Sequence, residues 1–190
     1  MTERRRNLYL TGFSGSGKTH SGRAAAKLLN LKFVDMDTII EARCGKTIPR
    51  IFEEAGEPRF RQLEHDVLVE ISAGMGQLIS TGGGTPMRQD NRDIMSQTGY
   101  VIRLRASAET IHERLTSSRG SRTRTLRPIL GGDAPVERIG QVLAEREQAY
   151  AAADMTLDTD GRSPSDVAAA IASAWRSVSA ELDSTLDRPE

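Results

Sequence analysis

Short apolar runs alternate along this chain with segments in which apolar residues recur three and four positions apart. The first pattern favours buried strands, and the second favours helices with one buried face. The expected strands are Leu8–Thr11, Lys32–Asp35, Gln77–Ser80, Tyr100–Leu104 and Met155–Asp158. The expected helices are Lys18–Leu29, Asp37–Arg43, Ile48–Ala55, Pro58–Ala73, Asp90–Ser96, Ala108–Thr116, Val136–Ala152 and Pro164–Ala180. Strands separated by helices predict an α/β fold, in which helices cover both faces of a five-stranded parallel sheet.

The chain has 190 residues, a length that suits one domain, which we assign to residues 1–180. Asp160-Gly161 forms a turn, Ser163 can cap the last helix and Pro164 suits the first helical position. Beyond residue 180 the apolar pattern weakens, so residues 181–190 are expected to form a disordered tail.

One motif stands out near the start of this domain. Gly12-Phe-Ser-Gly-Ser-Gly-Lys18-Thr19 matches G-x-x-x-x-G-K-[ST] directly after the first strand. Glycines allow positive φ and let backbone amides converge on a phosphate, while the following helix directs its positive dipole end at the same oxygens. A glycine-rich turn without a ligand is the alternative, but so many constrained positions favour a nucleotide-binding loop.

Within this loop each residue has an expected role. Gly15, Ser16, Gly17 and Lys18 are expected to hold the phosphates of ATP, with Lys18 reaching the β- and γ-phosphates. Thr19 carries the hydroxyl that would coordinate Mg²⁺. The motif alone leaves open whether the protein transfers a phosphoryl group or only senses a nucleotide.

The composition indicates which kinds of partner the protein is expected to bind. The formal net charge is zero and aromatic residues are few, at 4%, so neither a general positive field nor a stacking surface for nucleic acid is expected. The single cysteine, Cys44, excludes an internal disulfide, and no signal peptide or membrane-length apolar stretch is apparent. These features favour a cytoplasmic protein with no nucleic-acid or membrane partner and a small anionic ligand.

Two carboxylates end the second strand, in Val34-Asp35-Met36-Asp37. The carboxyl ends of parallel strands line the ligand crevice of such folds. Because side chains two apart on an extended segment point the same way, both carboxylates could enter one site, one near Mg²⁺ or a nucleophilic hydroxyl and the other at further hydroxyls. Alternatively, one of them, Asp37 in particular, caps the following helix.

Further polar positions complete the pattern. Arg61 and Glu64 are three apart on one helical face, so Glu64 could hold the Arg61 guanidinium in place, although such pairs are commonly surface features. Gly82-Gly83-Gly84 could offer bare amides to a ligand or form an ordinary turn. The polar segment 116–130 contains several arginines between two helices and is either a mobile lid or a solvated basic loop.

The order of these motifs resembles the shikimate kinase family. The resemblance rests on the phosphate loop, Asp-x-Asp, Gly-Glu-x-x-Phe-Arg-x-x-Glu, Gly-Gly-Gly, Arg127-Pro-x-Leu and Arg146 shortly before a Tyr, and it extends from about Leu8 to Ala168. It implies a three-layer α/β/α P-loop kinase fold with sheet order 2-3-1-4-5 and a mobile lid. It also implies a monomeric, Mg²⁺-dependent enzyme that phosphorylates the 3-hydroxyl of shikimate with ATP in aromatic amino-acid biosynthesis, yielding ADP.

The resemblance also implies roles by position. Lys18, Asp35 and Arg127 would be catalytic, with Asp35 contacting the reacting hydroxyl and Arg127 closing with the lid. Shikimate would be bound within residues 35–75 and by the glycine turn, and Mg²⁺ would be held by Thr19, Asp35 and, through water, Ser80. The expected substrate contacts are Asp37, Arg61, Gly82, Gly83, Gly84 and Arg146.

The remaining nucleotide contacts are less defined. His20 follows the Lys-Thr pair, Arg162 follows the last strand, and either Arg114 or Arg119 could stack on adenine.

Two rival functions also remain open. One is a related P-loop kinase acting on another acidic polyol, and the other is a nucleotide-binding regulator without catalysis.

Overall fold

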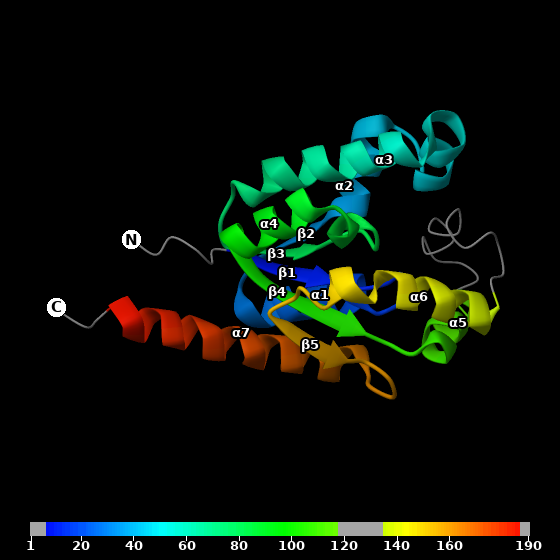
Figure 1. Cartoon of the computed structure of the whole chain (residues 1–190). Helices are drawn as coiled ribbons and strands as arrows, with labels where there is room; N and C mark the ends of the chain where they lie inside the picture. The colour runs from blue at the N-terminus through cyan, green and yellow to red at the C-terminus, as the bar shows by residue number, and fades with distance from the viewer. Residues whose placement is uncertain (1–6, 118–134, 187–190) are drawn as a thin grey trace.

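The computed structural model describes residues 7–117 and 135–186, and for residues 180–186 it describes only the backbone. Five parallel strands form one sheet in the order β2-β3-β1-β4-β5, which confirms the expected topology (Figure 1). The strands are β1 (Asn7–Thr11), β2 (Lys32–Asp35), β3 (Gln77–Ser80), β4 (Gly99–Arg105) and β5 (Met155–Asp158). The helices are α1 (Lys18–Leu29), α2 (Met36–Cys44), α3 (Ile48–Ser72), the short 3₁₀ helix η1 (Thr85–Met87), α4 (Gln89–Thr98), α5 (Ala108–Ser117), α6 (Val136–Tyr150) and α7 (Pro164–Leu186).

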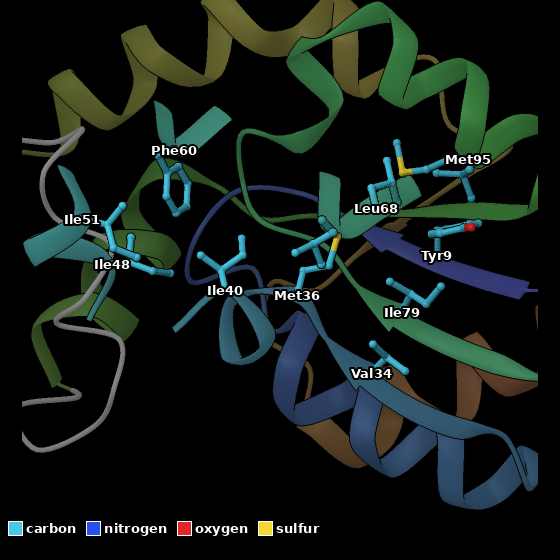
Figure 2. Packing of buried hydrophobic residues seen from close by; sticks show 12 residues of the cluster. Tyr9, Val34, Met36, Ile40, Ile48, Ile51, Phe60, Leu68, Ile79 and Met95 are labelled. Atoms are coloured by element: carbon cyan, nitrogen blue, oxygen red, sulfur yellow. The ribbon is translucent and has the colours of Figure 1, made fainter. Parts of the chain in front are cut away.

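Alternation along β1 separates two layers of core. Leu8 and Leu10 face α1 and α7, whereas Tyr9 faces α2, α3 and α4 together with Val34 and Ile79 (Figure 2). A third cluster packs Phe13 of the phosphate loop against α5 and α6. Since both faces of the sheet are covered, the loops at the carboxyl ends of the strands remain as the place for a ligand.

Helix α3 is bent at the place where two separate helices were expected. Gly56 has φ 73° and ψ 172°, a conformation outside the helical region that glycine tolerates, and Pro58 stands in the first turn after it. The bend therefore separates Ile48–Ala55 from the segment that carries Arg61 and Glu64, as the sequence predicts.

The expected starts of the C-terminal tail and of the lid are shifted in the structure. Helix α7 continues to Leu186, so the tail that was expected to be disordered from residue 181 is helical over residues 181–186. Thr116 was expected both as the end of a helix and as the start of the lid; it belongs to α5, which continues to Ser117, and its hydroxyl donates to the His112 carbonyl at 2.8 Å. The rest of the expected lid, residues 118–130, lies outside the described residues, and so does Arg127. Across the described residues, no helix combines the length and the apolar character that crossing a bilayer would require.

Candidate active site

The phosphate loop joins β1 to α1 and has the backbone that its glycines were expected to provide. Gly12, Gly15 and Gly17 have φ values of 134°, 83° and 102°. Gly17 immediately precedes α1, whose first helical residue is Lys18. The loop therefore ends at a helix N-terminus, where free N–H groups and the helix dipole favour an anion.

Lys18 lies at the centre of this loop. Its ammonium donates to the carbonyls of Gly12 at 2.7 Å and Phe13 at 2.9 Å, and only 8% of the residue is exposed. Burial lowers the pKa of Lys18 to about 8, although Asp37, Asp35 and Glu64 oppose this shift. The cation is thus held by neutral carbonyls and faced by carboxylates beside the phosphate-binding backbone.

Position 12 requires glycine for two reasons, namely its positive φ and its close packing against β4. A Cβ on Gly12 would overlap the Leu104 carbonyl oxygen of β4, whereas a Cβ on Gly45, which has φ 61°, would meet nothing within 4 Å. We expect Gly12→Ala to lower the free energy of unfolding by about 2–4 kcal/mol and Gly45→Ala by about 1 kcal/mol, because only Gly12→Ala adds an overlap to backbone strain. Urea unfolding of the two variants measures the difference, and equal losses would contradict this expectation.

The sequence did not decide whether Asp35 or Asp37 caps the helix that follows β2. In the structure, Asp35 is the N-cap of α2. Its Oδ1 accepts from the Thr38 backbone N–H at 3.3 Å, and its Oδ2 accepts from the Thr19 hydroxyl at 2.9 Å. In the sheet register Asp35 is paired with Ser80 at the end of β3. The structure therefore brings together the three expected metal ligands, and the alternative that Asp37 caps α2 is wrong.

Asp37 lies on the first turn of α2 rather than on an extended segment, and its carboxylate turns inward. Within the described part of the chain, its Oδ1 is buried and has no hydrogen-bond partner. Burial, with further contributions from Asp35 and Glu64, raises the pKa of Asp37 to about 7. A shielded carboxylate oxygen facing Lys18 is able to accept a hydrogen bond from a ligand hydroxyl.

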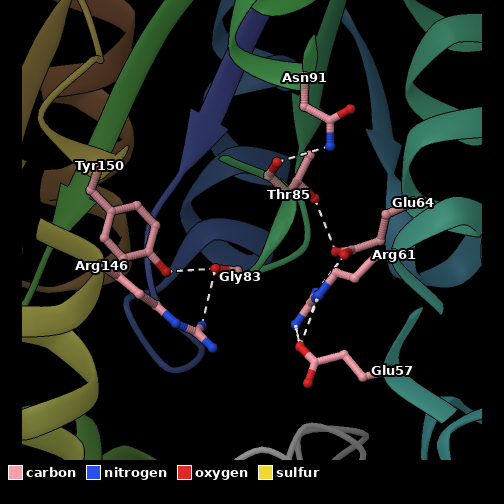
Figure 3. Close-up of polar contacts among 8 residues, drawn as sticks. All are labelled: Glu57, Arg61, Glu64, Gly83, Thr85, Asn91, Arg146 and Tyr150. Atoms are coloured by element: carbon pink, nitrogen blue, oxygen red, sulfur yellow. Dashed lines mark hydrogen bonds and ion pairs between the residues drawn. The ribbon is translucent and has the colours of Figure 1, made fainter. Parts of the chain in front are cut away.

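Arg61 is held by two carboxylates of its own helix (Figure 3). Its Nη1 is paired with Glu64, while its Nε and Nη2 donate to Glu57 Oε1 at 3.1 and 2.8 Å. The Glu64 side chain is only 1% exposed, so the Arg61–Glu64 pair is not a surface feature. Burial raises the pKa of Glu64, and the Arg61 guanidinium opposes this effect.

The glycine turn after β3 lies against these side chains. A Cβ on Gly84 would overlap the Arg61 guanidinium, and one on Gly82 would overlap Glu64. The Gly83 carbonyl accepts from the Tyr150 hydroxyl at 2.6 Å and from Arg146 Nη1 at 3.4 Å (Figure 3). The absence of side chains at Gly82 and Gly84 therefore allows Glu64 and Arg61 of α3 to approach the turn, while Arg146 of α6 contacts the Gly83 carbonyl.

The position of Arg146 is also set by its neighbours. The guanidinium lies 5.6 Å from the centre of the Phe13 ring, and Tyr150 follows one turn later on α6. Next to Arg146, Glu147 accepts two hydrogen bonds from Arg103 of β4, at 2.7 and 2.6 Å. This bidentate pair ties α6 to the sheet and so fixes where Arg146 enters the site.

On the other side of the phosphate loop lies Arg114. Its Nη1 donates to the Gly15 carbonyl at 3.2 Å and to the Thr159 hydroxyl at 3.0 Å, and its Nη2 donates to the Thr159 carbonyl at 2.8 Å. Arg162 and His20 are exposed, and Arg119 lies outside the described residues. The structure thus brings Arg114 to the phosphate loop.

Sequence reasoning missed several contributors. Thr85, Asn91 and Glu57 contact Arg61 or Glu64 directly or through one another, and Tyr150 binds the glycine turn. Tyr150 and Glu57 belong to motifs that were recognised, but neither was given a role. Thr85 and Asn91 follow the glycine triplet without any periodic or charge signal.

The arrangement places the phosphate loop beside a cluster of arginines and carboxylates. The family model described as shikimate kinase matches residues 14–176. The chain belongs to the shikimate kinase family. A shikimate kinase from Thermodesulfovibrio yellowstonii is 38% identical over 92% of this chain and 97% of its own length, and one from Symbiobacterium thermophilum is 42% identical over 87% and 93%.

Solved structures agree with this family membership. A shikimate kinase from Acinetobacter baumannii, solved in complex with shikimate, superposes with a TM-score of 0.83 at 34% identity and covers 93% of this chain and 96% of its own. A shikimate kinase from Bacteroides thetaiotaomicron gives a TM-score of 0.80 at 33% identity over 91% and 97%. A gluconokinase from Sinorhizobium meliloti, at 12% identity and a TM-score of 0.56, shares only the fold.

Proposed function

We propose that this enzyme transfers the γ-phosphoryl group of ATP to the 3-hydroxyl of shikimate, giving shikimate 3-phosphate and ADP. The observation that carries the proposal is the meeting of two sets of groups at one end of the sheet. Lys18 and the phosphate loop lie on one side, and Asp37, Arg61 and Arg146 lie around the glycine turn on the other. The second set matches a small acid that carries hydroxyl groups.

Two arginines from different elements are suited to the carboxylate of the substrate. Arg61 and Arg146 approach the same turn from α3 and α6. Two guanidinium groups can bind one carboxylate through charge-assisted hydrogen bonds, which fixes its orientation as well as its position. The acid is thereby held with its hydroxyl groups toward Asp37 and the phosphate loop.

The chemical step follows from the two aspartates. Asp35 already accepts hydrogen bonds at both of its oxygens, whereas Asp37 Oδ1 is shielded and has no partner among the described groups. We therefore assign the reacting hydroxyl to Asp37 in place of Asp35. The hydroxyl oxygen bonds to the γ-phosphorus, the bond to the β,γ-bridging oxygen breaks, and the hydroxyl proton passes to Asp37. Lys18 stabilises the charge on the transferred group.

The oxygen donors of Thr19 and Asp35, close to each other beside the phosphate loop, fit Mg²⁺, which prefers hard oxygen ligands and usually has few of them from protein. With Ser80 next to them, they would hold the ion, which neutralises phosphate charge when bound.

Arg114 is our candidate to flank the adenine. Arg127 remains a catalytic proposal, and Arg162 and His20 remain proposed nucleotide contacts. We further propose a cytoplasmic monomer.

Acceptor dependence of ADP release tests the function. With Mg-ATP, the purified protein is expected to release ADP rapidly with shikimate and at background rate with gluconate, with quinate or without an acceptor. A faster rate with another acid would assign the enzyme to a different acceptor. No release with any acceptor, together with intact ATP binding measured by calorimetry, would favour a nucleotide-binding regulator.

A further inference from the structure

Behind the substrate-facing surface, Glu64 is part of a buried chain of hydrogen bonds. Its Oε2 pairs with Arg61, and its Oε1 accepts from the Thr85 hydroxyl at 3.0 Å. Glu64 is 1% exposed and Thr85 is fully buried. Thr85 therefore cannot touch a bound substrate, yet it contacts the carboxylate that holds the substrate-binding arginine (Figure 3).

The series of hydrogen bonds continues from Thr85 to Asn91 of α4 and returns to α3 at His65. Asn91, which is 2% exposed, donates from Nδ2 to the Thr85 carbonyl at 2.9 Å. The other amide atom of Asn91, Oδ1, lies 2.7 Å from His65 Nδ1. Because an amide oxygen can only accept, the His65 Nδ1–H is the donor of this hydrogen bond. His65 directly follows Glu64, so the hydrogen bonds link α3, η1 and α4 in a closed circuit.

This circuit restrains Glu64 at both oxygens. Removing the Thr85 hydroxyl would leave Glu64 Oε1 buried beside Gly82 with one donor fewer, which is unfavourable for a carboxylate. The carboxylate would then rotate or share its contacts differently, and the Arg61 guanidinium bonded to it would move too. A small displacement matters because bidentate binding of a carboxylate depends on the direction of the guanidinium.

We propose that Thr85 and Asn91 are positioning residues, which set the affinity for the carboxylate of the substrate through Glu64 and Arg61. This inference rests on the proposed function, because it requires an acid as the acceptor. It separates binding from chemistry: the circuit holds Glu64 and, through it, Arg61, and none of its hydrogen bonds involves Lys18 or the phosphate loop. The substrate KM should therefore respond more than kcat.

The first test uses Thr85→Val and Thr85→Ser. Valine keeps the shape of the side chain and removes the hydroxyl, whereas serine keeps the hydroxyl. For Thr85→Val we expect the KM for shikimate to rise about tenfold, with kcat and the KM for ATP within about twofold of the wild type. Thr85→Ser should restore a KM close to that of the wild type. If Thr85→Val does not fold, Thr85→Ala removes the same hydroxyl and is judged by the same criterion.

Three controls and a second test variant identify the route of the effect. Tyr9→Phe removes another buried hydroxyl, which lies 2.7 Å from the Thr98 hydroxyl between β1 and α4, and should leave the KM for shikimate unchanged. Thr85→Val should add less than about twofold to the KM of Arg61→Ala, because both act on one contact. With the methyl ester of shikimate, the difference between Thr85→Val and the wild type should largely disappear. Asn91→Asp, which replaces the donor to Thr85 by an acceptor, should resemble Thr85→Val.

The outcomes are distinct. A folded Thr85→Val variant with an unchanged KM for shikimate overturns the inference while the function stands. Equal changes in kcat and in both KM values also overturn it, since they indicate a general structural role. If the wild type itself shows no shikimate-dependent ADP release, the proposed function fails, and the inference fails with it.

Discussion

Replacing Lys18 by methionine is expected to lower kcat about a thousandfold, while ATP binding weakens much less. Methionine approximates the length of lysine, but it has no charge for the phosphoryl group in transfer. Because that charge interaction is stronger in the transition state than in the bound substrates, its loss falls mainly on turnover. Steady-state kinetics measures kcat, and calorimetry with ATP measures binding.

A matched variant controls for general damage. Lys27→Met lies on the same helix, α1, at an exposed position near its end, and is expected to keep full activity. Lys18 also donates to the Gly12 and Phe13 carbonyls, so thermal unfolding of Lys18→Met must show a folded protein before its kinetics is interpreted. A kcat for Lys18→Met within tenfold of the wild type would refute the catalytic role of Lys18.

The features that could be predicted from sequence depend on local patterns. The strands follow from apolar runs, and the phosphate loop follows from the fixed spacing of Gly12, Gly17 and Lys18, whose backbone geometry only glycine and a helix start can satisfy. The bend in α3 was predictable for a similar reason, because Gly56 and Pro58 disfavour a continuous helix.

The features that could not be predicted depend on contacts between distant segments. Asp35 caps α2 if the helix begins at Met36, and Asp37 would cap it if the helix began two residues later. The observed start at Met36 makes Asp35 the cap and leaves the Asp37 carboxylate to the site. Thr85 acts on Glu64 across the space between η1 and α3, and Tyr150 acts on Gly83 across the space between α6 and the glycine turn. Neither contact has a sequence spacing that periodicity can detect.

The end of α7 shows a different limit. The chain loses its apolar pattern after residue 180, which argued for disorder, yet the helix continues to Leu186. Ala, Glu and Leu, which stand at positions 180–182, have high helix propensity, so an existing helix can extend over them. Apolar patterning therefore reports where a helix packs, and propensity decides how far it continues.

The acidic residues of the site explain why its function and its stability should respond differently to substitution. Asp35 and Glu64 lie close enough to Asp37 to contribute to raising the pKa of its carboxyl group, and Asp37 and Glu64 both have buried carboxylate oxygens. Like charges in a shielded region oppose folding, and such arrangements are concentrated at functional sites. Removing the charge of Asp37, whose Oδ1 has no hydrogen-bond partner among the described residues, should therefore reduce activity without reducing stability.

Asp37→Asn is accordingly expected to lower kcat by about 10²- to 10⁴-fold, the range of a lost general base, while the midpoint of thermal unfolding does not fall below that of the wild type. The amide has nearly the same shape, but it cannot take the proton of the reacting hydroxyl. Steady-state kinetics at saturating shikimate and a thermal melt measure both quantities.

Asp35→Asn provides the matched comparison. Since Asp35 contacts Thr19 and caps α2, its substitution should raise the Mg²⁺ concentration needed for half-maximal rate and lower the thermal midpoint. At saturating Mg²⁺ its kcat should exceed that of Asp37→Asn. The reverse order, with Asp35→Asn the less active variant at saturating Mg²⁺, would return the reacting hydroxyl to Asp35.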